Sequence, residues 1–147
     1  MRNETAQDLA QELLVAEFLS HQWGCTLKKI TEDRLFLADF AAVHNGRVAA
    51  FVEIRCRSCS RSTYPTIFLP LHKMLWADMV FNTTSVPYVY VVRFDADDVI
   101  AYKILTGLPR SLGISWVQRK TEPDTHPDGP VIEIPIDSFV AIKGKPL

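Results

Sequence analysis

Two carboxylates stand in apolar stretches of residues 35–57, where a carboxylate is costly. Asp39 interrupts the run LFLADFAAV, and Glu53 interrupts the run VAAFVEI. Both runs read as β-strands, and burying a carboxylate inside a sheet is unfavourable unless a counter-charge or a metal ion compensates it. A divalent cation bound by both carboxylates would supply that compensation, so the pair predicts a site for such a cation.

The turn between the two runs decides whether these carboxylates meet. The sequence HNGR at residues 44–47 is predicted to be a hairpin turn, because Asn and Gly tolerate positive φ. A two-residue loop would place Asp39 opposite Val52 and send Glu53 to the other face of the sheet. A three-residue loop, or one bulge, sets Asp39 opposite Glu53, and the metal site requires this second register.

A third carboxylate is predicted on the first helix, over residues 5–20. Glu17 lies four residues past the end of an apolar stripe and is expected to point inward with it, although a residue one turn from a helix end can also tilt out to solvent. Glu12 is placed on the polar side of the same helix. The stripe consists of Ala6, Leu9, Ala10 and Leu13.

The remaining elements predict an α/β fold with a mixed central sheet. A strand followed by a long connection with a helix and then another strand is a crossover, which pairs strands in parallel beside the antiparallel hairpin. Residues 58–66 are expected to be a loop. The chain is expected to be one domain over residues 1–147, with a core at about 5–105 and a C-terminal extension at 106–147. The expected elements after the first helix are strand 25–30, the hairpin, helix 70–82, strands 86–94 and 99–105, and a strand, turn and strand over 131–142.

Composition agrees with a compact cytoplasmic protein of a bacterium or a phage-infected cell. Hydrophobic residues make up 48% of the chain, yet no apolar run approaches the ~20 residues of a membrane span, and the N-terminal residues are too polar for a secretory signal. Three cysteines form no disulfide framework. Cys56 and Cys59, in the sequence CRSC, leave open an alternative as a redox pair or as half of a zinc site.

Basic residues gather in two windows that lack acidic residues, although the formal net charge is −1. Local potential rather than net charge steers a polyanion, so these windows fit a phosphate-binding groove, with ordinary solvated surface as the alternative. Residues 54–77 hold Arg55, Arg57, Arg61 and Lys73, and residues 99–121 hold Lys103, Arg110, Arg119 and Lys120. The expected contacts to nucleic acid are Arg57, Arg61, Tyr64 and Lys73.

The order of these elements, with Asp39 followed fourteen residues later by the E-x-R sequence at residues 53–55, resembles the PD-(D/E)XK nuclease superfamily of restriction-endonuclease and Holliday-junction-resolvase type. The resemblance covers residues 6–94, and the tail IPIDSF is similar to small phage members. It implies a restriction-endonuclease-like αβββαβ core with a central mixed sheet flanked by helices. It also implies hydrolysis of DNA phosphodiester bonds with Mg²⁺ or Mn²⁺, held by Asp39, Glu53 and the backbone carbonyl of Ile54, with Glu17 completing the site.

The sequence departs from the family at Arg55, where the family has a lysine. Arginine clamps a phosphate but cannot act as a base. Three outcomes are open: Arg55 only orients water and phosphate, or Lys73 reaches back from the next helix to supply the ammonium, or the site has decayed. In the last case the protein is a catalytically inactive nucleic-acid-binding or phage accessory protein. A homodimer is expected if both strands are to be cut.

Overall fold

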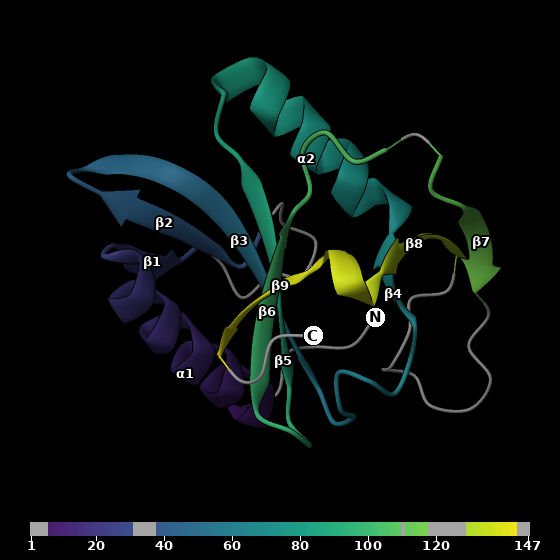
Figure 1. The fold of residues 1–147 in the computed structure, drawn as a ribbon. Coiled ribbons are helices and arrows are strands. Elements are labelled where there is room, and N and C mark those ends of the chain that lie inside the picture. Colours follow the sequence, from purple (N-terminus) through teal and green to yellow (C-terminus); the bar gives the residue numbers. More distant parts are fainter. Residues whose placement is uncertain (1–5, 31–37, 110, 118–128, 144–147) are drawn as a thin grey trace.

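The computed structural model describes residues 6–30, 38–109, 111–117 and 129–143 (Figure 1). No helix in these ranges combines the length and the apolar character needed to cross a bilayer. The elements are α1 (Ala6–Trp23), β1 (Thr26–Lys29), β2 (Phe40–His44), β3 (Arg47–Arg57), β4 (Thr66–Pro70), α2 (Leu71–Thr84), β5 (Tyr88–Phe94), β6 (Val99–Ile104), β7 (Ile114–Val117), β8 (Gly129–Pro135), a 3₁₀ turn (Ile136–Ser138) and β9 (Val140–Lys143).

The main sheet has the strand order β1-β2-β3-β5-β6-β9 among the described residues. Strands β3 and β5 pair in parallel, and the other neighbours pair antiparallel. The connection from β3 to β5 carries helix α2 and is therefore the predicted crossover. The α/β class and the mixed sheet flanked by helices are confirmed.

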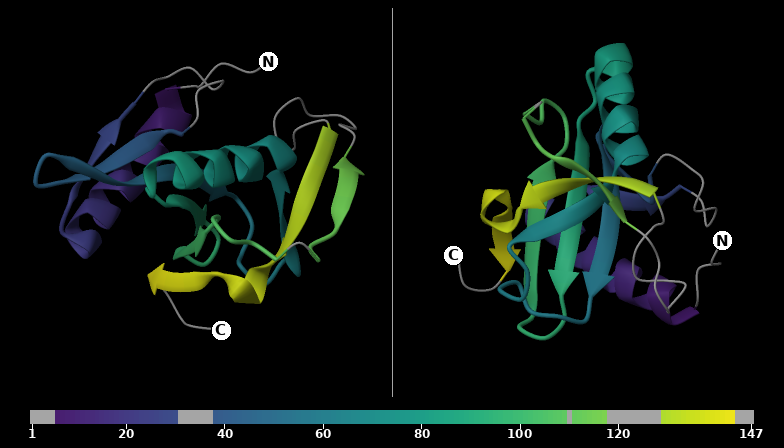
Figure 2. Two further views of the ribbon diagram at one scale, coloured as in Figure 1. Left: turned by 90° about the horizontal axis from the view of Figure 1, so that it is seen from above. Right: turned by 90° about the vertical axis from the view of Figure 1, so that its right-hand side faces the viewer.

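The two helices lie on opposite sides of the main sheet (Figures 1 and 2). Helix α1 buries Val15, Ala16 and Leu19 against one face, where they contact side chains such as Phe40 and Ile54. Helix α2 packs on the other face through Ala77, together with strands β4 and β8. Strand β3 is thus covered on both faces, as its nearly continuous apolar sequence indicates.

A second sheet, of order β4-β8-β7 in the described part of the chain, was not expected. Its first strand, β4, alternates buried Ile67 and Leu69 with half-buried neighbours and is bounded by prolines, so it is short. Pro70 precedes α2 instead of being its first residue. The C-terminal extension supplies β8 to this sheet and β9 to the main one.

The β2–β3 hairpin adopts the register that a metal site requires. Asn45 and Gly46 form its turn with positive φ of 50° and 73°. Phe40 pairs with Val52, and a bulge after Ala42 shifts the register by one residue. Continued one residue beyond β2, this pairing sets Asp39 against Glu53, because the bulge inserts the extra residue that a two-residue turn alone would lack.

Candidate active site

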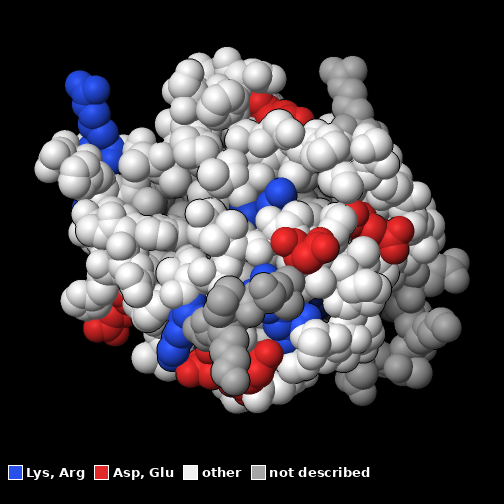
Figure 3. Space-filling view, in the orientation of Figure 1, with Lys and Arg blue, Asp and Glu red and all other residues white. Residues whose placement is uncertain are grey.

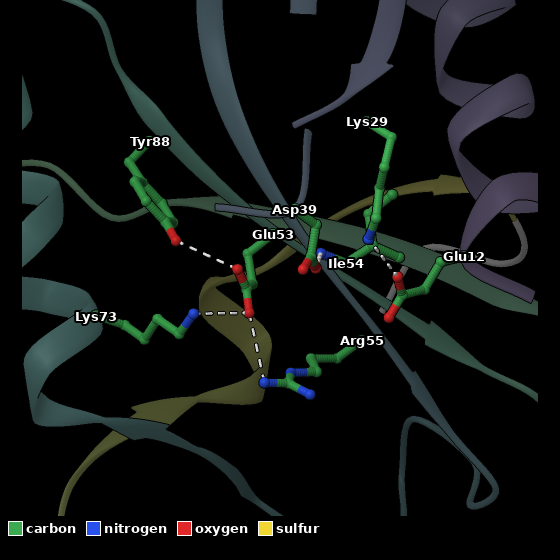
Figure 4. A network of polar contacts seen from close by, with 8 residues as sticks. All are labelled: Glu12, Lys29, Asp39, Glu53, Ile54, Arg55, Lys73 and Tyr88. Carbon is green, nitrogen blue, oxygen red and sulfur yellow. Dashed lines mark hydrogen bonds and ion pairs between the residues drawn. The ribbon is translucent and has the colours of Figure 1, made fainter. Parts of the chain in front are cut away.

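Asp39 is fixed by backbone hydrogen bonds at the start of β2. Its Oδ2 accepts a hydrogen bond from the backbone N–H of Ile54 at 3.1 Å, and its own carbonyl accepts one from the N–H of Ile30 at 3.0 Å. The carboxylate thus accepts the Ile54 N–H hydrogen bond of β3 that a backbone carbonyl of a neighbouring strand would otherwise accept. Burial, and then the negative charge of Glu53, raise the pKa of Asp39. Figure 4 shows the two carboxylates side by side.

Glu53 is almost completely buried, with a relative exposure of 2%, and three side chains contact its carboxylate. Lys73 Nζ lies 2.9 Å from Oε1, Arg55 Nη2 lies 3.4 Å from the same oxygen, and the Tyr88 hydroxyl donates to Oε2 at 3.3 Å (Figure 4). Burial and the charge of Glu53 raise the pKa of Tyr88, which keeps the hydroxyl protonated as a donor. The buried charge is therefore paired and hydrogen-bonded, as a buried carboxylate must be.

The lysine beside Glu53 is Lys73, which comes from α2, whereas position 55 on β3 itself is an arginine. It extends from the first turn of α2, is itself buried, and lies with Nζ 5.3 Å from the centre of the Trp76 ring. Arg55 contacts the same carboxylate but keeps 38% of its side chain exposed. Burial lowers the pKa of Arg55, but the negative charges of Glu53 and Asp39 more than offset this effect. The pKa is therefore raised overall, and the guanidinium stays charged. The geometry thus agrees with the outcome in which Lys73 reaches back.

The carboxylate that α1 turns toward the sheet is Glu12, and the inward orientation predicted for Glu17 is wrong. Glu17 is exposed, as is Leu13 from the predicted stripe, at 46%. Helix α1 instead buries Glu12, Val15, Ala16 and Leu19, which recur at the same i, i+3, i+4, i+7 spacing. That second stripe was readable in the sequence, but periodicity does not say which of two apolar faces is covered.

Lys29 was not singled out from the sequence, yet it lies beside these acids. Its Nζ is 3.4 Å from Glu12 Oε2 and 5.0 Å from the centre of the Phe40 ring. Its positive charge is one of the influences that lower the pKa of Asp39, against the larger effects of burial and Glu53. The cation belongs to β1, whose sequence TLKK gave no sign of which lysine faces the site.

The predicted nucleic-acid contacts are only partly available. Arg61 is 5% exposed, and its Nη2 donates to the carbonyl of Phe139 at 3.1 Å, so its predicted role on the surface is wrong. Lys73 is engaged with Glu53 and is also no surface cation. Tyr64 is 65% exposed and Arg57 is half-buried, and their contacts with nucleic acid remain predictions.

Charges of both signs are interspersed on the face shown in Figure 3, with no broad basic field there. In the window 54–77, two of the four cations are buried, so this window is no continuous surface patch. In the window 99–121, Arg110, Arg119 and Lys120 lie outside the described residues.

The two cysteines of CRSC do not form a common site. Cys56 packs with the cluster under α1, whereas Cys59 packs with the cluster on the opposite face of the sheet. Burial, and then Glu12, raise the pKa of Cys56 to about 11, which keeps its thiol protonated at neutral pH. The alternatives of a redox pair or a zinc site therefore find no support in this geometry.

The donor set at Asp39 and Glu53 fits Mg²⁺ or Mn²⁺ without being a closed cage. No three His, Cys, Asp or Glu side chains in the described ranges gather closely enough to hold a metal ion. Mg²⁺ is commonly held by one or two carboxylates and completes its shell with water and substrate phosphate. Burial, and then the charge of Glu53, raise the pKa of Asp39, and a divalent cation between the two carboxylates would favour the ionised form of Asp39.

The mixed sheet between two helices, with Asp39 and the E-x-R sequence brought together and a lysine beside them, is the arrangement expected of the PD-(D/E)XK class. The chain belongs to the family described as "Phage putative PDDEXK endonuclease", whose model matches residues 1–142. The resemblance noted from the sequence is thereby confirmed.

The chain is also similar to a solved structure, the Holliday junction resolvase Hjc of the archaeal hyperthermophile Archaeoglobus fulgidus. The identity is 12%, the alignment covers 86% of this chain and 84% of that one, and the TM-score is 0.50. At this identity the likeness concerns the fold. No curated protein matches the chain.

Proposed function

We propose that this protein hydrolyses phosphodiester bonds of DNA with Mg²⁺ or Mn²⁺ as its cofactor. The observation that carries the proposal is the convergence of two carboxylates, that of half-buried Asp39 just before β2 and that of buried Glu53 on β3, with the Lys73 ammonium 2.9 Å from Glu53. Membership of a PDDEXK family supports the nuclease class. The choice of metal and of DNA follows from the chemistry of the ligands and from the class.

Asp39, Glu53 and the Ile54 carbonyl would hold the ion, and Glu12, the carboxylate that α1 turns inward in place of Glu17, would contribute through a water molecule. When bound, such an ion polarises the scissile phosphodiester and lowers the pKa of a water. The hydrogen bond from the Ile54 N–H orients the Asp39 carboxylate independently of any metal ion. The protein therefore provides a largely preorganised pair of acids.

Two cations, Lys73 and Arg55, lie where the family has one lysine, and each would have a separate role. Lys73 is buried and holds Glu53 in place, whereas Arg55 is exposed enough to contact a phosphate and bind it bidentately. Positive charge near the developing negative charge stabilises the transition state. An ammonium at this place weighs against a decayed site that only binds nucleic acid.

Cleavage assays test the proposal directly. The purified protein is incubated with supercoiled plasmid, a single-stranded oligonucleotide and a four-way junction, in Mg²⁺, Mn²⁺ or EDTA. The junction is included because the similar structure is a Holliday junction resolvase. We expect cleavage that depends on the metal and is lost in Asp39→Asn and Glu53→Gln, while Glu17→Gln, a change at an exposed acid, retains it.

Cleavage that survives in both site variants, or in EDTA, would overturn the proposal. A protein that shifts DNA in a gel but nicks it with neither ion would instead support the inactive binding module. Light scattering with and without DNA tests the homodimer, which we propose because cutting both strands of a duplex needs two such sites.

A further inference from the structure

Lys29 is held against the acidic groups by side-chain contacts and by the pairing of its strand. Its ammonium pairs with Glu12 on α1 and lies over the ring of Phe40. Lys29 is also the register partner of Phe40 in the β1–β2 pairing, and the next residue, Ile30, donates its N–H to the carbonyl of Asp39. The strand pairing therefore fixes Lys29 on the strand next to Asp39.

Figure 4 shows the Lys29 ammonium between the carboxylates of Glu12 and Asp39, on the side away from Lys73. With Arg55 and Lys73 at Glu53, the described part of the site contains three carboxylates and three cationic side chains. Such a site has little net negative charge to attract a free cation. Each cation beside the carboxylates reduces the negative potential that attracts a free metal ion.

We infer that Lys29 lowers the affinity of the Asp39–Glu53 site for a free divalent cation, because its ammonium occupies the neighbouring cationic position between Glu12 and Asp39. The inference rests on the proposed function, since it concerns the same metal site. Lys29 has no assigned part in the chemistry. It is a residue that tunes metal binding through Glu12 and Asp39.

The chain offers a matched control one residue away. Lys28 lies on the same strand but is exposed, whereas Lys29 is half-buried toward the site. Lys28→Met and Lys29→Met make the same change in net charge and side-chain type. Lys29→Arg keeps the charge at the site and serves as the conservative variant.

The experiment measures binding of Mn²⁺ alone, without nucleic acid, by the electron paramagnetic resonance signal of the free aqueous ion. Thermal melting confirms that each variant is folded, and Lys29→Gln replaces Lys29→Met if the latter is not. We expect the neutral variant at position 29 to bind Mn²⁺ at least tenfold more tightly than the wild type. We expect Lys28→Met and Lys29→Arg to stay within twofold of it.

An Mn²⁺ affinity of the folded, neutral position-29 variant that is no higher than that of Lys28→Met would overturn the inference. So would a Lys29→Arg variant that binds as tightly as the neutral one. If the wild type still cleaves DNA in either case, the proposed function stands and only the role of Lys29 fails. If no variant binds Mn²⁺ and the wild type cleaves nothing, both fail.

Discussion

Replacing Lys73 by methionine is expected to destabilise the fold by about 3 kcal/mol, because it removes the cation nearest to the buried Glu53 carboxylate. The two side chains are 7% and 3% exposed, and their charged atoms lie 2.9 Å apart. At an effective dielectric constant of about 20, unit charges at this distance attract by about 6 kcal/mol. Arg55 and Tyr88 still contact the carboxylate in the variant and compensate part of the loss. The net destabilisation is therefore expected to be about half of this attraction, which is within the range for broken buried pairs.

Urea denaturation followed by tryptophan fluorescence measures this loss, with an unchanged m value as the sign that the unfolded state is the same. Arg55→Met is the comparison, because Arg55 contacts the same oxygen at 3.4 Å but is 38% exposed. Solvent screening limits its expected cost to below about 1 kcal/mol. The double variant Lys73→Met/Glu53→Gln removes both buried charges and is expected to show a coupling of about 2 kcal/mol.

Three results would refute this reasoning. The first is a loss below about 1 kcal/mol in Lys73→Met, and the second is a larger loss in Arg55→Met. The third is a Lys73→Met/Glu53→Gln double variant whose loss of stability equals the sum of the losses in Lys73→Met and in Glu53→Gln. Each would mean that Lys73 does not hold the carboxylate and that the buried charge is compensated elsewhere.

The remaining predictions concern the other acids and the buried arginine. Burial and Glu53 raise the pKa of Asp39, so its ionisation opposes folding, and stability is lost as the pH rises from the unfolded-state pKa of about 3.9 through the folded-state pKa. Asp39→Asn is therefore expected to melt at a higher temperature than the wild type at pH 7, to lose this advantage near pH 3, and to cleave nothing. Glu12→Gln is expected to lower the cleavage rate at least about tenfold, whereas Glu17→Gln stays within about twofold in the same assay. Arg61→Met removes a buried guanidinium whose Nε and Nη1 have no hydrogen-bond partner among the described residues. Its free energy of unfolding, measured by urea denaturation, is therefore expected to lie within about 1 kcal/mol of the wild-type value or above it. Gel shifts are expected to give an unchanged DNA affinity.

Each of these has a contrary outcome. An Asp39→Asn variant that is less stable at pH 7 would show that the carboxylate contributes to folding. Equal losses in Glu12→Gln and Glu17→Gln would mean that the orientation of α1 does not matter to the reaction. Weaker DNA binding by Arg61→Met would restore the role in nucleic-acid binding that was first predicted from the sequence.

The pair Asp39 and Glu53 could be found in the sequence because a carboxylate inside an apolar strand is conspicuous. The hairpin arms, the crossover and the strands after it followed from apolar runs bounded by turn residues. The register did not follow, since a two-residue turn and a bulge place the same residues on opposite faces. Only the paired strands decide between them, and they place the bulge after Ala42.

The helix acid was harder, because α1 has two apolar faces. Ala6, Leu9, Ala10 and Leu13 make one stripe, and Val15, Ala16 and Leu19 continue the other from Glu12. Periodicity gives the angle between two residues on a helix and not the face that meets the sheet. The small second sheet was missed for another reason: β4 is five residues long, and β8 pairs with it from far along the chain.

The pairing of β4 with β8 connects the candidate active site to the C-terminal part of the chain. Strand β4 ends at Pro70, directly before α2, and Val131 is its partner there. Lys73 stands three residues later, so the point from which its ammonium reaches Glu53 is set by β8, whose own acid, Glu133, accepts a hydrogen bond from Ser115. A truncated protein ending at residue 117 would keep every carboxylate of the centre and lose the strand that aligns its cation.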